Sequence, residues 1–393
     1  MNQKRVASID VFRALTMYLM VFVNALWTVK GVPVWLEHAP EAADGMGFAD
    51  IIFPAFLFLV GLSLPYAQRH RLSKDPSRRR LFIHILLRSV ALIVMGFFQM
   101  NLEYYSGRAV LPEPVWEIGI TLGFFLIWLD YASSKQPVLR LQQLIGILLL
   151  IVMALLYRGR EGDRIIGLQP HWWGILGLIG WAYFAAAVLL LLGGERIWLM
   201  SLLLVFFVGI NAASMLETSG WLKPFWDHTG SLGLGNASNT SLVLAGVLTG
   251  CLYRKFSGQS GKLAAWMISL AMLCMLFGFI TRPLWGISKI RATPSWTMIS
   301  GAISILIFGT LIWLVDHKRK AHWFGLIKPA GTSTLTCYLL PYFWEAVFIS
   351  LIGIRLPEAL RTGWVGILKT LAFALLIVLI TGWLEKRRLR LKI

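Results

Sequence analysis

A histidine and an aspartate stand at the entrance of a long apolar run, in the segment WLEHAPEAADGMGFADIIFPAFLFLVG (residues 35–61). A neutral imidazole can take a proton from a nucleophile near neutral pH, and a neighbouring carboxylate can orient the ring and stabilise its protonated form. His38 and Asp50 therefore have the clearest potential for acid–base chemistry. The alternative for Asp50 is helix capping, since exposed N–H groups in the first turn of a helix favour a carboxylate.

Amide and hydroxyl side chains gather at the ends of other apolar runs on the same predicted face. Asn24 ends the first run, and Ser238 and Asn239 open the eighth in LGNASNTS. Such groups can hydrogen-bond a sugar or an amide-bearing chain. We expect Asn24 and Asn239 to converge with His38 and Asp50 in one external cavity. The alternatives are an interhelical hydrogen bond for Asn24 and an ordinary helix start for Ser238 and Asn239.

Charged and hydroxylated residues near other predicted spans form a second group. Asp10 and Arg13 are spaced i to i+3, so they can meet on one helix face and offset each other's charge. Trp296 follows Lys289 in the basic segment RPLWGISKIRATPSWTM, and Ser333 lies in TSTLTC. Small hydroxylated residues also permit close helix packing, which is the alternative for Ser333.

The elements that position these residues are membrane-spanning helices. Of the residues, 57% are hydrophobic and 14% charged, and a bilayer core needs roughly 20 apolar residues per helical span. We predict an all-α polytopic membrane protein with about twelve transmembrane helices (ten to twelve), forming one domain over residues 1–393. The predicted spans are residues 9–29, 48–67, 81–100, 115–131, 140–157, 172–193, 197–216, 238–254, 262–281, 296–315, 332–352 and 364–384.

Basic residues alternate between the loops and thereby predict the orientation of the chain. Lys and Arg accumulate in cytoplasmic loops, so we expect both termini in the cytoplasm and His38 on the external face. Anionic lipid and this bias account for most of the net charge of +18, and we expect no nucleic-acid partner. The basic segments are Lys4 and Arg5, the loop from Arg69 to Arg80, Arg254 and Lys255, DHKRK, and the tail EKRRLRLK.

The cysteines and motifs exclude several classes of protein. Cys251, Cys274 and Cys337 all fall within predicted spans, so we interpret them as packing residues and expect no metal site. The chain has no nucleotide-binding loop, HExxH or GxSxG motif. ATP-driven pumps and hydrolases of the soluble type are therefore disfavoured.

Several of these segments together resemble a known family. RVASIDVFRALT, the helix ending at Asn24, the pair His38 and Ala39, and ADIIFPAFLFLVG resemble the transmembrane heparan-α-glucosaminide N-acetyltransferases and their bacterial relatives. Looser similarity continues in WWGILGLIGWAYF, LGNASNTSLVLAGVLTG, the segment ATPSWTMISGAISILIFGTLIWLVD and GTSTLTCYLLPY. Two departures are the longer PEAADGMGF between His-Ala and Ala-Asp and the missing Gln-Arg where this chain has GILGLIG.

The resemblance implies a transmembrane acetyltransferase with acetyl-CoA as cosubstrate and an amino sugar such as a terminal glucosamine as acceptor. It implies His38, Asp50 and Asn24 as catalytic residues. His38 would act as a general base or, in a ping-pong route, as the carrier of the acetyl group, and the sequence leaves both open. We expect acetyl-CoA to enter from the basic cytoplasmic side and react toward the periplasm of a bacterial inner membrane. The rivals are an O-acyltransferase of a periplasmic glycan and a sugar transporter, and the sequence leaves a homodimer open. The expected acetyl-CoA contacts are Arg13, Ser238, Asn239, Trp296 and Ser333.

Overall fold

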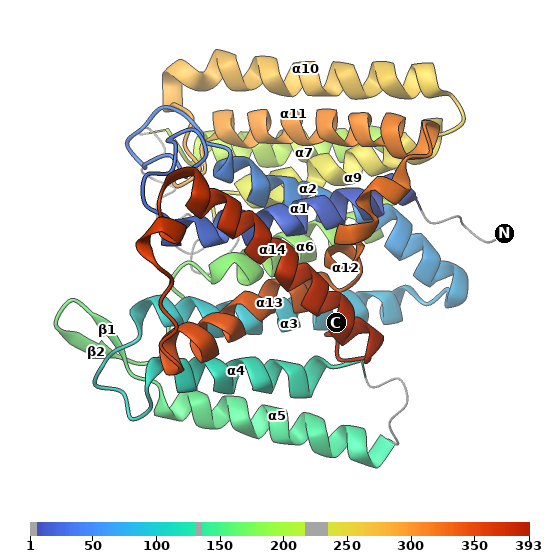
Figure 1. The fold of residues 1–393 in the computed structure, drawn as a ribbon. Coiled ribbons are helices and arrows are strands. Elements are labelled where there is room, and N and C mark those ends of the chain that lie inside the picture. Colours follow the sequence, from blue (N-terminus) through green and yellow to red (C-terminus); the bar gives the residue numbers. More distant parts are fainter. Residues whose placement is uncertain (1–5, 131–135, 217–234) are drawn as a thin grey trace. The chain divides into compact units, whose positions relative to one another are not determined.

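The computed structural model describes residues 6–130, 136–216 and 235–393 (Figure 1). The predicted cytoplasmic residues Lys4 and Arg5 lie outside them. The helices are α1 (Ala7–Ala25), α2 (Ala49–Lys74), α3 (Arg78–Met100), α4 (Glu113–Trp128), α5 (Gln136–Leu156), α6 (Gly174–Gly193), α7 (Ile197–Ala213), α9 (Ser238–Phe256), α10 (Ser260–Trp285), α11 (Pro294–Leu311), α12 (Lys328–Thr332), α13 (Thr334–Trp344) and α14 (Gly363–Lys386), and one antiparallel hairpin is formed by β1 (Gly159–Glu161) and β2 (Arg164–Ile166).

The predicted class, an all-α polytopic membrane protein, is confirmed. Each of the twelve predicted spans coincides with a helix. By length and composition, nine helices of the described residues can cross a bilayer. The other three predicted spans correspond to α4 and α7, which have 16 and 17 residues, and to α9. Helix α9 is rich in Ser, Thr and Gly and is buried along most of its length, so it packs against protein rather than lipid.

The chain forms two compact units. Unit 1 comprises Met1–Thr16, Val32–Val90 and Leu178–Gly325, and unit 2 comprises Met17–Gly31, Ala91–Gly177 and Leu326–Ile393. The organisation as one domain stays a prediction.

Unit 1 is built on a close crossing of α2 and α9. A Cβ atom at Gly61 of α2 would lie 1.8 Å from the carbonyl oxygen of Val243, and one at Gly246 of α9 would lie 1.9 Å from that of Phe58. Only glycine lets the two backbones approach so closely, as small residues do at helix contacts in membranes. This crossing fixes the N-terminal ends of α2 and α9, which carry Asp50 and Ser238.

A hairpin of two long helices completes this part of unit 1. Helices α10 and α11 run side by side (Figure 1), and Thr281 and Ser295 share a buried hydrogen bond of 3.1 Å between them. Thr293 caps α11 by accepting from the Trp296 amide, and Pro294 occupies the first turn, where its missing N–H is harmless. The turn between the helices therefore ends at Thr293, and α11 begins at Pro294.

The far end of α9 and the π-helical segment Ile312–His317, which follows α11, are tied to the start of α1. Asp316 accepts a 2.6 Å hydrogen bond from the Ser8 hydroxyl and a 3.1 Å bond from the Tyr253 hydroxyl. The predicted pairing of Asp10 with Arg13 is confirmed at 3.2 Å. These contacts anchor the first part of α1, up to Thr16, within unit 1.

Unit 2 contains the antiparallel pair α4 and α5 and the short hairpin. The Trp116 indole donates to the backbone oxygen of Met153 at 2.8 Å, and a Cβ at Gly119 would meet the Met153 sulfur at 2.6 Å. Helix α5 turns many apolar side chains outward, as expected of a surface that faces lipid.

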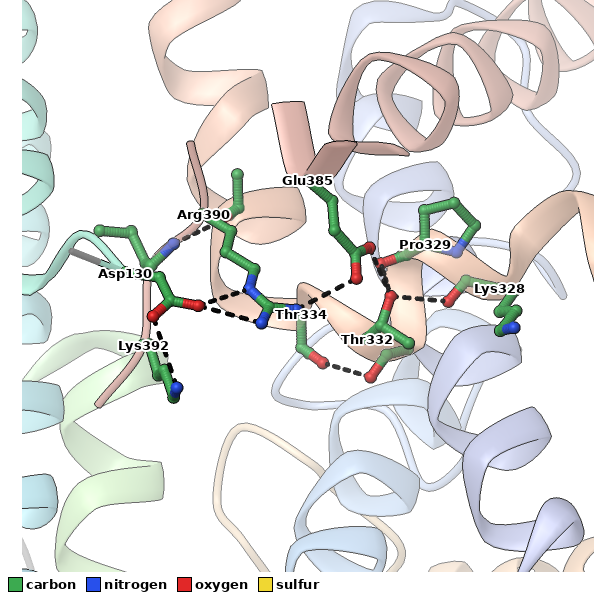
Figure 2. Close-up of polar contacts among 11 residues, drawn as sticks. Asp130, Lys328, Pro329, Thr332, Thr334, Glu385, Arg390 and Lys392 are labelled. Carbon is green, nitrogen blue, oxygen red and sulfur yellow. Dashed lines mark hydrogen bonds and ion pairs between the residues drawn. The ribbon is translucent and has the colours of Figure 1, made fainter. Parts of the chain in front are cut away.

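The C-terminal tail of unit 2 is held by a polar network (Figure 2). Arg390 donates to Asp130 at 3.0 Å and to Glu385 at 3.2 Å, and Lys392 lies 3.4 Å from Asp130. Glu385 in turn accepts from the Thr332 hydroxyl at 2.6 Å. The tail therefore joins the end of α4 to the turn between α12 and α13.

Candidate active site

The side chain of Asp50 lies at the start of α2 and points back into the preceding loop. Its Oδ2 accepts from the backbone amides of Ala39 and Gly47, at 2.9 and 3.0 Å, and its Oδ1 lies 2.6 Å from His38 Nδ1. Asp50 is only 1% exposed, and a buried carboxylate requires such hydrogen bonds. The carboxylate therefore binds both the loop backbone and the imidazole, and it is more than an ordinary helix cap.

The imidazole of His38 combines this anchoring with access to solvent. Its side chain is 47% exposed. Because Asp50 as a carboxylate only accepts hydrogen bonds, the Nδ1 atom facing it must carry the proton. In the neutral ring the lone pair then lies on Nε2, which is the arrangement of a general base held by a carboxylate.

The loop that carries His38 is closed on itself by a tight backbone approach. The Phe48 amide donates to the Trp35 carbonyl at 2.7 Å. A Cβ at Gly47 would lie 1.9 Å from the Glu37 carbonyl oxygen, so this position requires glycine. The two arms of the loop thus bring Ala39 and Gly47 to the same carboxylate.

A second loop, residues 286–293 between α10 and α11, is docked onto the first through Asp44. The Ile287 amide donates to Asp44 at 2.7 Å, and Arg282 donates to it at 3.0 Å. In return, the Gly45 amide donates to the Ile287 carbonyl at 2.9 Å. The hydrogen bonds from Ile287 and Arg282 hold the pKa of the Asp44 carboxyl below its ordinary value.

This docking brings Lys289 to the His38–Asp50 pair. The Lys289 Nζ lies 3.2 Å from His38 Nδ1, 3.5 Å from Nε2 and 3.9 Å from Asp50 Oδ1. Burial lowers the pKa of Lys289, and the attraction of Asp50 opposes this shift. In the sequence, Lys289 stands out only as part of a basic segment. No local signal links it to His38, since the contact depends on the docking of two loops far apart in the chain.

Trp296 lies beneath the start of α2. Its indole N–H donates to the backbone oxygen of Asp50 at 3.3 Å, and the side chain is 1% exposed. The predicted acetyl-CoA contact of Trp296 stays a prediction, and the observed contact supports the end of the helix that carries Asp50.

The start of α9 is joined to α11 by a buried polar cluster. Ser238 and Thr297 share a 2.5 Å hydrogen bond between their hydroxyls. Asn211 of α7 and Asn236 each donate to the Ala292 carbonyl at 3.1 Å. Asn211 was not a predicted site residue, although an amide within the apolar run of α7 is a signal that could have identified it.

The remaining predicted residues are distributed over both units. Arg13 of unit 1 is engaged by Asp10 and by the Ser63 hydroxyl at 2.9 Å. Asn24 is exposed and belongs to unit 2, as does Ser333. Asn239 is half-buried in the first turn of α9. The convergence of Asn24 and Asn239 with His38 stays a prediction. The acetyl-CoA contacts of Arg13, Ser238, Asn239 and Ser333 also stay predictions.

The cysteines match their prediction as packing residues. Cys251, Cys274 and Cys337 are buried and unpaired with one another. Within the described ranges, no group of three or more His, Cys, Asp or Glu residues could hold a metal ion.

Comparison with known proteins identifies relatives over part of the chain. Human heparan-α-glucosaminide N-acetyltransferase is 31% identical over 140 residues, which are 34% of this chain and 20% of the human protein. The mouse protein of the same name is 31% identical over 126 residues, which are 30% of this chain and 18% of the mouse protein. The match thus spans about a fifth of the length of these relatives.

A family model described as "Domain of unknown function (DUF5009)" matches residues 5–234. This range is more than half of the 393 residues. The protein is therefore a member of the DUF5009 family and a relative of heparan-α-glucosaminide N-acetyltransferase.

Proposed function

We propose that the protein is a transmembrane acetyltransferase that moves the acetyl group of cytosolic acetyl-CoA to the amino group of glucosamine or a related amino sugar. The observation that carries this proposal is the His38–Asp50 pair, with its 2.6 Å contact and a half-exposed imidazole. The human and mouse relatives are named heparan-α-glucosaminide N-acetyltransferase, which supports the same reaction class. We propose that the reaction takes place on the external face, which the predicted orientation of the loops supports. The resemblance to bacterial relatives supports a bacterial inner membrane, with the periplasm on that side.

The proposed reaction is a direct transfer with His38 as general base. The amine nitrogen attacks the acetyl carbonyl carbon, a C–N bond forms, and the carbonyl electrons move to oxygen. Nε2 of His38 takes the proton from the attacking nitrogen, while Asp50 stabilises the resulting imidazolium. The C–S bond then breaks, and the departing thiolate of CoA takes the proton from His38.

The other predicted residues have supporting or binding roles in this proposal. Ser238 and Trp296 direct their polar groups toward Thr297 and the Asp50 backbone, so they support the site. Asn24 and Asn239 hydrogen-bond the acetyl oxygen or the sugar. Arg13 and Ser333 contribute to the binding of acetyl-CoA, which enters from the cytoplasmic side.

The experiment is an acetyl-transfer assay on the purified protein in detergent, with radiolabelled acetyl-CoA and a panel of amino sugars. We expect label to move to an amino sugar in the wild type and the rate to fall about 10²- to 10⁴-fold in His38→Ala, the typical contribution of general-base catalysis. His70→Ala is the control, because His70 is an exposed residue near the C-terminal end of α2, the helix whose first turn carries Asp50. Substantial activity of folded His38→Ala would refute the proposed chemistry.

Product analysis separates the rival functions. An N-acetyl product survives mild base, whereas an O-acetyl ester is cleaved, so base-labile label would identify an O-acyltransferase of a glycan. Sugar uptake into proteoliposomes that contain no acetyl-CoA would instead identify a transporter.

A further inference from the structure

The amino group of Lys289 lies beside the imidazole of His38, 3.2 Å from Nδ1 and 3.5 Å from the reacting Nε2, and it has hydrogen-bonding capacity to spare. An ammonium group has three donors, and among the described residues its hydrogen-bond contacts are the two ring nitrogens, at 3.2 and 3.5 Å. Nδ1 carries the proton that faces Asp50, so it cannot also accept from Lys289. Asp50 Oδ1, at 3.9 Å, balances the charge without a direct hydrogen bond.

The backbone around Lys289 holds this side chain in place. Its carbonyl accepts from the Ala292 amide at 3.0 Å, and the Thr293 amide donates to the Ser288 carbonyl at 3.1 Å. The Ser288 amide also donates to the Thr293 hydroxyl at 3.1 Å. The loop is therefore a compact turn, and a group held in this way needs little reorganisation when charge develops beside it.

The polarity of the surroundings favours an oxygen atom as the missing partner. A cation that is 25% exposed beside a 1% exposed carboxylate lies in an environment where electrostatic interactions are stronger than in water. A carbonyl oxygen that reacts next to Nε2 is neutral at first and gains negative charge as the nucleophile attacks. Such an oxygen is stabilised by Lys289 more strongly in the transition state than in the ground state.

We propose that Lys289 is a further catalytic residue, whose ammonium group donates a hydrogen bond to the carbonyl oxygen of the acyl group reacting at His38. This inference rests on the proposed acetyl transfer. It adds to that site a charged donor for the carbonyl oxygen of the acetyl group. When the nucleophile bonds to the carbonyl carbon, the C=O electron pair moves to the oxygen that Lys289 contacts. The pair returns to the carbonyl when the C–S bond breaks, and the lysine is unchanged.

The test compares kcat and KM for Lys289→Met, Lys289→Arg and the wild type in the acetyl-transfer assay. We expect Lys289→Met to lower kcat about 10²- to 10³-fold, as loss of an oxyanion donor does, with KM for acetyl-CoA within about threefold. Lys289→Arg should retain a larger part of kcat because it keeps a charged donor. Lys262→Met is the matched control, since Lys262 is exposed at the start of α10, and its kcat should equal that of the wild type.

Chemical rescue distinguishes catalysis from a structural role. Added ethylammonium should restore part of kcat to Lys289→Ala by placing a small ammonium ion in the vacated space, whereas a protein that has lost its loop structure would not respond. A kcat of Lys289→Met within twofold of the wild type, or the absence of any rescue, would overturn the assignment.

Hydrolysis of acetyl-CoA in the absence of any sugar separates failure of this inference from failure of the proposed function. Water then replaces the amine, while the same carbonyl oxygen gains charge. If no amino sugar is acetylated, the acceptor assignment fails, and a hydrolysis rate that still depends on Lys289 supports the inference. Equal hydrolysis by the wild type and Lys289→Met, or no hydrolysis and no transfer, would refute it.

Discussion

The carboxylate of Asp50 is fixed by three hydrogen bonds, and one of them, at 2.6 Å, holds the imidazole of His38. The buried member of this pair thus orients the member that solvent reaches, with side chains 1% and 47% exposed. Ala39 and Gly47 supply the other two donors, so the loop cannot move without breaking bonds to Asp50. The orientation of the imidazole ring therefore depends on the loop backbone as much as on the carboxylate.

The substitution Asp50→Asn should separate the effect of the carboxylate charge on catalysis from the effect of the side-chain shape. An asparagine amide can donate to Nδ1, which would shift the ring proton to Nε2 and remove the base. We expect kcat for acetyl transfer to fall at least about 10²-fold, with a smaller change in KM. Thermal unfolding in detergent should show a folded protein. Retention of more than a tenth of the wild-type kcat would contradict the role assigned to the carboxylate.

The pH dependence of the reaction should report Lys289. The groups facing its amino group are His38 and Asp50, and burial lowers the pKa of Lys289 while Asp50 opposes the shift. The ammonium form is present below this pKa and is lost as pH rises through it. We therefore expect kcat to fall on the alkaline side at a pH below that of an ordinary lysine.

Lys289→Arg provides the control for this alkaline limb. Guanidinium stays protonated throughout the accessible range, so the limb should move to higher pH in this variant. If the substitution leaves the alkaline fall of kcat unchanged, that fall belongs to a group other than Lys289.

The sequence predicted the His38–Asp50 pair because both residues belong to one loop and the helix that follows it. Their contact needs only a local turn, which the segment between them encodes. Lys289 could not be predicted in the same way, because it reaches the pair through the docking of Asp44 onto Ile287 and Arg282. Contacts between distant loops leave no periodic signal in a single sequence.

The positions of the helices could be predicted from the sequence. Whether each helix contacts lipid or is surrounded by protein could not. A run of apolar residues identifies a helix in a membrane protein, as all twelve predicted spans illustrate. It does not distinguish a helix in contact with lipid from one surrounded by protein, such as α9. The hairpin β1–β2 was not predicted, although Gly162, with φ +58°, and Asp163 form a typical two-residue turn.

The crossing of α2 and α9 predicts a strong difference between two glycine substitutions. In Gly246→Ala the new Cβ would lie 1.9 Å from a backbone carbonyl oxygen, so the helices must separate, and we expect a loss of about 1–3 kcal/mol of unfolding free energy. Gly301→Ala is the matched control, because its nearest neighbour would be a side-chain atom of Leu242 at 3.9 Å. It should be neutral or stabilise by up to about 1 kcal/mol, and equal stabilities of the two variants in denaturant unfolding would contradict the close crossing.

The polar network at the C-terminal tail predicts that the protein becomes less stable as the pH falls into the acid range. Burial alone would raise the pKa of Asp130, but hydrogen bonds from Arg390 and the attraction of Lys392 outweigh it and hold this pKa below its ordinary value. A carboxyl whose pKa is lower in the folded state contributes stability above its unfolded pKa. This contribution is lost as pH falls through the folded pKa. The melting temperature of the wild type should therefore fall between about pH 5 and pH 2.

Asp130→Asn isolates this contribution from that of other carboxyls. At neutral pH we expect it to lose about 2 kcal/mol, the typical value of a hydrogen bond to a charged group, because Arg390 and Lys392 would keep their charges without the carboxylate. Its deficit against the wild type should shrink on acidification, since protonation removes the same charge from the wild type. Asp163→Asn is the matched control, because Asp163 is fully exposed, and its melting curve should follow the wild type at every pH. A deficit of Asp130→Asn that stays constant with pH would show that the charge on Asp130 does not hold the tail.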